Sequence, residues 1–473
     1  MLPHIPALRR GKSYASLDQA NVNDCRTGEP VARISQINVG IIRKDLAKTS
    51  ESRAALKQLS CGRLIEICVK AAGLFLNETL PLGEHTQSPD QYVETLSATS
   101  GLPFVMVRRN MQKLAQALQN MRSVLNGLTR GLDLSMLDRG HGEQWGTRIS
   151  FHPTAQCLGL VMPSNSPGVN SLWLPAIPLK VPVMLKPGRE EPLTPYRLIQ
   201  ALIAAGCPAE AFGFYPTDHE GAAEILRSCG RSLAFGDKST TAQYANNPAI
   251  QIHGPGFSKI LVGDDQIERW PELLDIMASS IADNGGRSCI NASAVVVSKC
   301  AAEIADALGR RLGPVAPLPA RDERAGLAAF ANPAMADGIE SMIEAGLRTP
   351  GATEMTAKYR GGPRKVSFEG GVYLRPAVVH CDSFAHPLAN REFLFPYASV
   401  IQVPQSEMLE QIGPSLVVTA ITNDAGFREA LLESPLIDRL NLGPISTMKV
   451  SWDQPHEGNL FEFLYRRRAI ELA

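Results

Sequence analysis

The sequence has no net charge, no closely paired cysteines and no long apolar run, and each absence excludes a class of protein. Its 47 lysines and arginines balance 47 aspartates and glutamates, so no net field favours nucleic acid or an anionic membrane. No apolar run is long enough to span a bilayer, and the amino terminus has no apolar signal core. We therefore expect no nucleic-acid partner, no membrane segment and no secretory leader.

Cysteine and histidine patterns that would hold a metal are also missing. The nine cysteines are scattered and never spaced Cys-x-x-Cys, which argues against a zinc ribbon. An odd number of scattered cysteines is more typical of reduced thiols in a cytoplasm than of a framework of disulfide bonds. The nine histidines show no metal-ligand spacing either. The sequence therefore predicts a cytoplasmic protein without a structural metal.

What is present is the composition of an ordinary globular protein with several domains. Hydrophobic residues make up 44% of the chain and charged residues 20%, and 473 residues suffice for two or three packed domains. We predict a loosely attached arm over residues 1–55, a helical segment with an α/β domain over 56–253, a second α/β domain over 254–440 and a C-terminal segment over 441–473.

Hydrophobic periodicity predicts helices first and a parallel sheet afterwards. Apolar residues recur every three or four positions from Leu56 to Leu76 and from Tyr92 to Leu132, which is typical of amphipathic helices. Between Ile149 and Pro216, short apolar runs alternate with helical stretches, one of them within residues 165–179, the pattern of parallel strands joined by helical crossovers. A ligand is expected outside the carboxyl ends of these strands, where Pro163-Ser164-Asn165 and Lys186-Pro187 fall. The following domain is predicted to contain strands over 259–262 and 372–380 and a helix over 301–312.

One cysteine, Cys289, stands directly between a flexible turn and a strand. Gly285 and Gly286 precede it and allow backbone angles that other residues resist, and the β-branched run 294–297 follows it. This arrangement presents a nucleophilic thiol at the edge of a cleft. From these residues alone, an ordinary buried cysteine is the alternative.

Several short motifs occur in an order that resembles the aldehyde dehydrogenase superfamily, over roughly residues 145–425. They are, in chain order, Pro163-Ser164-Asn165, Leu185-Lys186-Pro187, Ala205-Gly206-Cys207-Pro208, Gly254-Pro255-Gly256, Cys289 and Glu392-Phe393-Leu394-Phe395-Pro396. The resemblance implies an α/β fold with a Rossmann-like cofactor domain ending near residue 253, a related catalytic domain over 254–440 that bears the thiol, and a small oligomerisation element. It also implies a homodimer or homotetramer.

The resemblance assigns roles to the matching residues. Cys289 would attack a carbonyl carbon as a thiolate, and the Asn165 amide with the Cys289 backbone N–H would form the oxyanion hole. Lys186 and Glu392 would hydrogen-bond the two riboses of NAD or NADP at the cofactor-binding edge to which Pro163 belongs. A turn-capping Asn165 and a surface Glu392 are the structural alternatives.

The first departure from the family pattern concerns product release. Hydrolytic members carry a water-activating glutamate four residues before the position of Phe257, and this chain has His253 there. Gly254-Pro255-Gly256 and Asp283-Asn284 instead resemble the CoA-acylating branch, in which a thiol rather than activated water takes the acyl group. A histidine can serve as a base because its unperturbed pKa is about 6.5, although a packed strand-end residue is the alternative.

Two further departures concern the cofactor. Arg189 stands where NAD-using members often have a glutamate for the ribose 2′-hydroxyl, and a guanidinium suits the 2′-phosphate of NADP instead. The stretch from Phe235 to Ser239 replaces the family's Thr-Gly-Ser phosphate turn. Ser239 and the helix amides are predicted to receive the pyrophosphate, which Asp237 opposes if it faces inwards.

We therefore expect an oxidoreductase that interconverts an aldehyde and an acyl derivative through a thioester on Cys289, with NADP or NAD as cofactor. The favoured version uses an aldehyde or an acyl thioester as substrate and coenzyme A as co-substrate. Two alternatives stay open: a hydrolytic enzyme in which His253, or a carboxylate from elsewhere in the chain, activates water, and a non-catalytic relative with a binding role. The stretch 455–465 matches no family pattern and receives no role.

Overall fold

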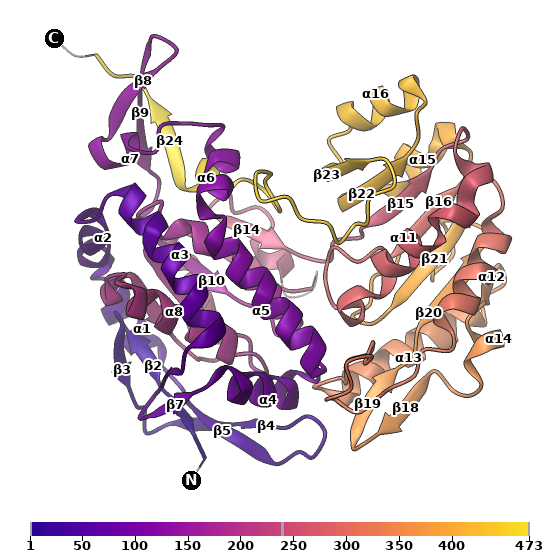
Figure 1. Cartoon of the computed structure of the whole chain (residues 1–473), viewed down its shortest axis with the longest axis horizontal. Coiled ribbons are helices and arrows are strands. Elements are labelled where there is room, and N and C mark those ends of the chain that lie inside the picture. Colours follow the sequence, from indigo (N-terminus) through magenta and orange to yellow (C-terminus); the bar gives the residue numbers. More distant parts are fainter. Residues whose placement is uncertain (1, 238–240, 472–473) are drawn as a thin grey trace.

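Two seven-stranded sheets organise the chain into two lobes, which Figure 1 shows side by side. The computed structural model describes residues 2–237 and 241–471. The sheet of the first lobe has the order β14 (Ile250–His253), β13 (Gly230–Phe235), β10 (Cys157–Val161), β11 (Val183–Lys186), β12 (Phe212–Phe214), β2 (Ala7–Arg9) and β3 (Lys12–Tyr14). The first five strands are parallel, as predicted, and β2 and β3 are antiparallel.

The second lobe repeats this architecture. Its sheet has the order β17 (Ala352–Glu354), β20 (Ala377–Cys381), β21 (Tyr397–Gln402), β16 (Ala294–Val297), β15 (Lys259–Val262), β22 (Ser415–Ile421) and β23 (Ile437–Leu442), parallel except for β17. Its helices are α11 (Trp270–Ala282), α12 (Ala301–Leu312), α13 (Pro333–Leu347), α14 (Ala357–Arg360), α15 (Gln405–Ile412) and α16 (Ala425–Glu433). The doubly wound α/β fold predicted from the sequence is therefore observed.

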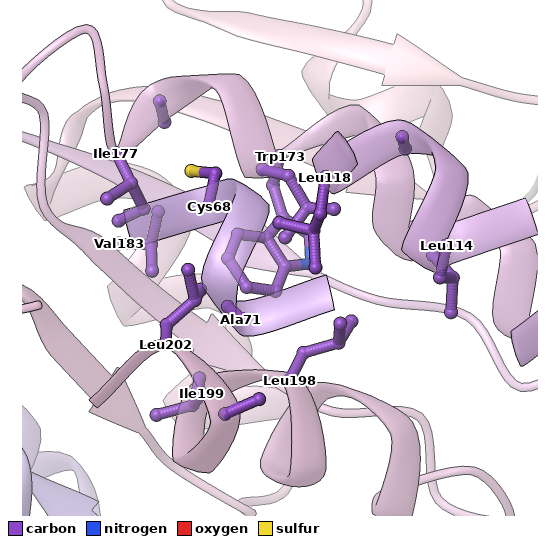
Figure 2. Close-up of a cluster of buried hydrophobic side chains, with 14 of the residues drawn as sticks. Cys68, Ala71, Leu114, Leu118, Trp173, Ile177, Val183, Leu198, Ile199 and Leu202 are labelled. Atoms are coloured by element: carbon purple, nitrogen blue, oxygen red, sulfur yellow. The ribbon is translucent and has the colours of Figure 1, made fainter. Parts of the chain in front are cut away.

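The helices of the first lobe build one large core against its sheet. They are α1 (Val39–Leu46), α2 (Thr49–Lys57), α3 (Cys61–Asn77), α4 (Pro89–Ser100), α5 (Phe104–Gln119), α6 (Met121–Thr129), α7 (Met136–Arg139), α8 (Leu193–Ala205) and α9 (His219–Ser228). Figure 2 shows Leu118 of α5 beside Trp173, and Leu114 of α5, Cys68 of α3 and Leu198 of α8 belong to the same core. This packing fixes the rotation of α5 about its axis.

Both ends of the chain belong to the first lobe. A loosely attached arm was predicted over residues 1–55, and the described part of it, residues 2–55, packs on this lobe. Here β2 joins the sheet beside β12, and β1 (His4–Ile5) pairs with β5 (Pro30–Ser35), which also pairs with β4 (Gln19–Asn23). The C-terminal segment leaves β23 and crosses back to α17 (Leu460–Leu464) and β24 (Tyr465–Arg468), drawn in yellow in Figure 1. There β24 forms a three-stranded antiparallel sheet with β9 (Thr147–Pro153) and β8 (His141–Gln144).

Two predicted elements differ from the structure for local reasons. The helix expected within residues 165–179 is reduced to two short 3₁₀ turns, Pro167–Leu172 and Leu174–Ala176, because Pro175, inside the expected helix, lacks the N–H that a continuous helix needs. The strand expected over 372–380 is broken at Pro376. It becomes β19 (Gly371–Leu374), paired with β18 (Lys365–Phe368), and β20. A further small hairpin joins β6 (Leu80–Leu82) to β7 (His85–Gln87).

Candidate active site

Cys289 follows a turn that requires unusual backbone angles. Asn284, Gly285 and Gly286 have left-handed φ values of 56°, 66° and 67°. A Cβ atom at Gly286 would lie 2.3 Å from the backbone carbon of Phe395, so no side chain fits there. The two glycines of the sequence are thus needed for conformation and for close packing.

The backbone of Cys289 is held from two sides. A Cβ atom at Gly256 would lie 2.0 Å from the Cys289 carbonyl oxygen, so the hinge glycine allows the loop to approach closely. Ser258 Oγ donates a hydrogen bond of 2.9 Å to the same oxygen. Asn291 Oδ1 accepts from the Ser288 N–H at 2.9 Å, which fixes the residue just before the thiol. The nucleophile therefore lies on a rigid support.

A cavity of about 420 Å³ opens beside the thiol. Five residues that the sequence assigns to the site line it together: Pro163, Asn165, His253, Cys289 and Glu392. Ser164, after β10, and Gly236, after β13, also line it, so the cavity reaches the carboxyl ends of the parallel strands. This is the edge of the sheet at which the sequence pattern predicted a ligand.

Asn165 is directed at the loop that carries the thiol. Its Nδ2 donates to the Arg287 carbonyl at 2.8 Å. Arg287 is itself buried, and its guanidinium donates to the carbonyls of Ser100 and Ala329. A side-chain amide nitrogen carries two N–H groups, so the second can reach a developing oxyanion beside Cys289.

His253 lies at the end of β14 and stacks on Phe235, with ring centroids 4.5 Å apart and planes at 14°. Its Nδ1 lies 2.8 Å from Glu457 Oε1, which is within the range of an ion pair. The angle between the two groups does not meet hydrogen-bond geometry. Its Nε2 is buried without a hydrogen-bond partner among the described residues. The position of the missing glutamate is thus occupied by a histidine that faces a carboxylate from another part of the chain.

Glu457 reaches the cavity because the C-terminal segment is anchored on both sides of it. Gln251 Nε2 of β14 donates to the Glu457 carbonyl at 3.0 Å, and Asn459 Nδ2 donates to the Leu128 carbonyl at 2.9 Å. A Cβ atom at Gly127 would lie 2.2 Å from the Asp453 carbonyl oxygen, so the segment packs closely on α6. No role could be assigned to this segment from its sequence, yet its residues His456 and Glu457 line the cavity.

The charges around the thiol oppose its ionisation in the resting protein. Burial raises the pKa of Cys289 well above its ordinary value, and the carboxylates of Glu457 and Glu392 raise it further. The ammonium of Lys113 acts in the opposite direction. Formation of the thiolate therefore depends on positive charge in the cavity.

Lys113 of α5 is the second residue of the site that sequence reasoning missed. It lines the main cavity and a smaller adjoining chamber of about 70 Å³, whose other lining is largely apolar. His456 and Glu457 line both spaces as well. Arg439 Nη1 lies 2.8 Å from His456 Nδ1. Burial lowers the pKa of His456 well below its ordinary value, and Lys113 and Arg439 add to this.

The residues assigned to the cofactor are only partly brought together. Glu392 accepts a 2.6 Å hydrogen bond from the Phe257 N–H, and burial raises its pKa to about 7. Lys186 ends β11 half-buried, and Arg189 is exposed; neither lines the cavity, whereas Glu190 does. Ser239 lies outside the described residues.

A broader inventory of the described residues adds three findings. The cysteines are all free thiols. Over residues 2–237 and 241–471, no three histidine, cysteine, aspartate or glutamate side chains gather as a metal ion would require. Within the same ranges, no helix combines the length and the apolar character needed to cross a bilayer.

Comparison with known proteins agrees with the geometry. The chain is 27% identical over 268 residues to an aminoacetaldehyde dehydrogenase from Pseudomonas aeruginosa, a match that covers 51% of this chain and about half (49%) of that relative. An NAD-dependent aldehyde dehydrogenase from Sinorhizobium meliloti has a similar fold, with a TM-score of 0.80, 16% identity and coverage of 99% of this chain and 94% of that one.

The aldehyde dehydrogenase KauB from Pseudomonas aeruginosa also has a TM-score of 0.80, at 15% identity, over 99% of this chain and 97% of that one. At these identities the two solved structures show the fold alone. The profile of the aldehyde dehydrogenase family matches residues 15–412, well over half of the chain. Glu457 lies beyond the matched range. The chain therefore belongs to the aldehyde dehydrogenase family.

Proposed function

We propose that this protein oxidises an aldehyde with NAD or NADP and releases the free carboxylic acid, with Glu457 as the group that activates water. The observation that carries the proposal is the pair of His253 and Glu457, 2.8 Å apart in the cavity that contains Cys289. It supplies a carboxylate where hydrolytic members keep their glutamate. The name of the aminoacetaldehyde dehydrogenase relative supports an aldehyde as substrate.

In the first half of the reaction, Cys289 attacks the aldehyde carbon as a thiolate. The carbonyl oxygen becomes negative and is stabilised by the Asn165 amide and the Cys289 N–H. A nicotinamide cofactor would supply the hydride acceptor that this carbon needs to become a thioester on Cys289. Asn165 and the rigid backbone around Cys289 keep the carbon in place during both events.

In the second half, Glu457 takes a proton from a water molecule whose oxygen attacks the thioester carbon. The carbon–sulfur bond then breaks, the acid leaves and the Cys289 thiolate is restored. His253 acts as a positioning residue, because its ring is fixed by stacking on Phe235 and its Nδ1 faces the carboxylate. We therefore assign the base to Glu457 and its orientation to His253.

The cofactor-binding edge offers groups that fit a dinucleotide. Lys186 is half-buried at the end of β11 and has no hydrogen-bond or ion-pair partner among the described residues, so its ammonium is free to bind ribose hydroxyls. Glu392, Pro163 and Ser164 all line the cavity. Arg189 is exposed next to Lys186, and its charge supports NADP over NAD.

A CoA-dependent reaction is the second candidate. His253 replaces the usual glutamate, and Gly256 lets the backbone approach Cys289 as the resemblance to the acylating branch suggests. In that reaction coenzyme A, rather than water, takes the acyl group, and the Glu457 carboxylate has no water to activate. Both candidates share the Cys289 thioester.

The deciding experiment follows NADH and NADPH formation from a panel of aldehydes with and without coenzyme A, in ¹⁸O-labelled water. Hydrolysis predicts turnover without coenzyme A and one ¹⁸O atom in the acid. Glu457→Gln should lower kcat about 100-fold or more while a first burst of reduced cofactor persists. Asp453→Asn, an exposed residue of the same segment, is the matched control. Turnover only with coenzyme A would overturn the proposal.

We further propose that the protein acts in the cytoplasm as a homodimer or homotetramer. The free thiols of all nine cysteines suit a reducing compartment. The sheet of β24, β9 and β8 projects from the first lobe and offers an edge for a second copy. Sedimentation of the purified protein measures the number of subunits.

A further inference from the structure

We propose that Lys113 binds an acidic group on the substrate, so that the preferred aldehydes carry a carboxylate or another anion. This inference rests on the proposed aldehyde oxidation at Cys289 and names its substrate class. The carbonyl carbon would lie at Cys289 and the anionic end of the same molecule at the Lys113 ammonium.

The position of Lys113 is set by the packing of its helix. Leu114 and Leu118 of α5 are buried in the core, which turns the neighbouring Lys113 towards the cavity. Its Cδ would lie 3.6 Å from a Cβ atom at Gly168, so the lysine stem runs alongside this part of the cavity wall. The direction of the ammonium is therefore built into the fold.

Lys113 has no hydrogen bond or ion pair with any described residue. Burial lowers its pKa, the Cys289 thiolate acts in the opposite direction, and the Arg439 cation lowers it further. A buried ammonium is costly unless an anion pairs with it directly. Since no described residue forms an ion pair with Lys113, a ligand in the cavity is the natural source of that anion.

The acidic residues of the cavity do not neutralise Lys113. Glu457 faces His253, and Glu392 is held by the Phe257 N–H. Glu190 and Asp237 line the main cavity at the carboxyl ends of β11 and β13 but not the smaller chamber that Lys113 also lines. Beyond Lys113 lie His456 and the Arg439 cation. Lys113 is therefore the cation that lines the smaller chamber, and Arg439 adds a second positive charge through its contact with His456.

Lys113 and the nucleophile face the same space. Lys113 and Cys289 line one cavity of about 420 Å³, and the ammonium is close enough to the thiol to lower its pKa. One substrate can therefore place its carbonyl carbon at Cys289 and its anionic group at Lys113.

A rival role for Lys113 is to stabilise the Cys289 thiolate itself. The two roles are separated by alkylating Cys289 with iodoacetate, which is anionic, and iodoacetamide, a neutral reagent of similar size. Stabilisation of the thiolate accelerates both reagents equally. Attraction of a carboxylate accelerates only iodoacetate.

The experiment measures both rates at Cys289 by peptide mass spectrometry, so that the other cysteines do not interfere. We expect Lys113→Met to lower the ratio of iodoacetate to iodoacetamide rates about tenfold. Lys113→Arg should keep the ratio high. Lys70→Met, which removes an exposed lysine of α3, is the control. An unchanged ratio in Lys113→Met, or an equal loss with both reagents, would overturn the inference.

Turnover gives an independent readout with two aldehydes of matched length, 4-oxobutanoate and butanal. The ratio of their kcat/KM values should favour 4-oxobutanoate and fall at least about tenfold in Lys113→Met. If the ratio is the same in both proteins, Lys113 does not select the substrate. If neither aldehyde is oxidised, the proposed function fails while the alkylation ratio still decides whether Lys113 attracts anions.

Discussion

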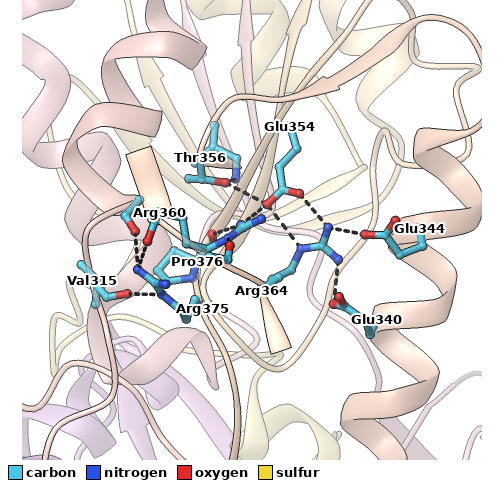
Figure 3. A network of polar contacts seen from close by, with 12 residues as sticks. Val315, Glu340, Glu344, Glu354, Thr356, Arg360, Arg364, Arg375 and Pro376 are labelled. Carbon is cyan, nitrogen blue, oxygen red and sulfur yellow. Dashed lines mark hydrogen bonds and ion pairs between the residues drawn. The ribbon is translucent and has the colours of Figure 1, made fainter. Parts of the chain in front are cut away.

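The buried charges around Glu354 and the charge of Lys113 differ in whether the protein itself supplies an oppositely charged partner. In the second lobe, Glu354 bonds both Arg360 and Arg364, and Arg364 also bonds Glu340 at 2.7 Å and Glu344 at 2.9 Å (Figure 3). Between the lobes, Lys113 has no partner among the described residues. The first group holds the fold together, and the second leaves charge available for a ligand.

The electrostatics of the two groups follow from this pairing. Although burial alone would raise the pKa of Glu354, hydrogen bonds from Arg364 and Arg360 keep it below its ordinary value. Burial lowers the pKa of Lys113 with no hydrogen-bonded partner to offset it. A charged residue is thus stabilised in its ionised form in one place and destabilised in the other.

The largest effect is expected from breaking the paired group. Glu354→Gln leaves two buried guanidinium groups without their shared carboxylate and should lower the free energy of unfolding by about 3–5 kcal/mol. Urea denaturation followed by circular dichroism measures this. Glu344→Gln removes a half-exposed partner of the same cluster and should cost under about 1 kcal/mol. Similar losses in both variants would contradict the distinction.

The opposite sign is expected at Lys113. Lys113→Met removes an unpaired cation and keeps the apolar stem, so we expect the free energy of unfolding to rise by about 1 kcal/mol at pH 7. The folded-state pKa of Lys113 is lowered, so the folded protein loses this proton at a lower pH than the unfolded chain.

The stability advantage of Lys113→Met is therefore fully present below the folded-state pKa and shrinks as the pH rises towards about 10.5, the unfolded value. Denaturation of both proteins between pH 7 and pH 10 tests the sign. An advantage that grows with pH would show that Lys113 gains a partner in the folded state.

The repetitive parts of the fold could be predicted from the sequence because local patterns determine them. The strand Lys259–Val262 and the helix Ala301–Leu312 have the predicted bounds, since a β-branched run and an apolar stripe each define one element. The strand expected over 372–380 fails at Pro376, where tertiary packing places a break inside a continuous apolar pattern. Pattern alone does not resolve such interruptions.

The site divides in the same way. Cys289, Asn165 and His253 follow recognisable motifs, and the structure brings them to one cavity. Glu457 carries no such signal, because its role depends on a segment that returns from the second lobe to the first. Lys113 lies at the margin of the buried stripe of α5, where an amphipathic helix ordinarily places a solvated lysine. Only the tertiary fold turns these two residues inwards.

The smallest expected effect is that of Glu457 on the ionisation of Cys289. Burial is the main cause of the raised pKa of Cys289, and Glu457 is the next largest. Lys113 lowers this pKa. Glu457→Gln should therefore shift the pH profile of Cys289 alkylation by neutral iodoacetamide to lower pH and raise its rate severalfold at pH 8. Asp453→Asn should leave the profile in place. A shift to higher pH in Glu457→Gln would mean that the carboxylate accepts the thiol proton rather than repelling the thiolate.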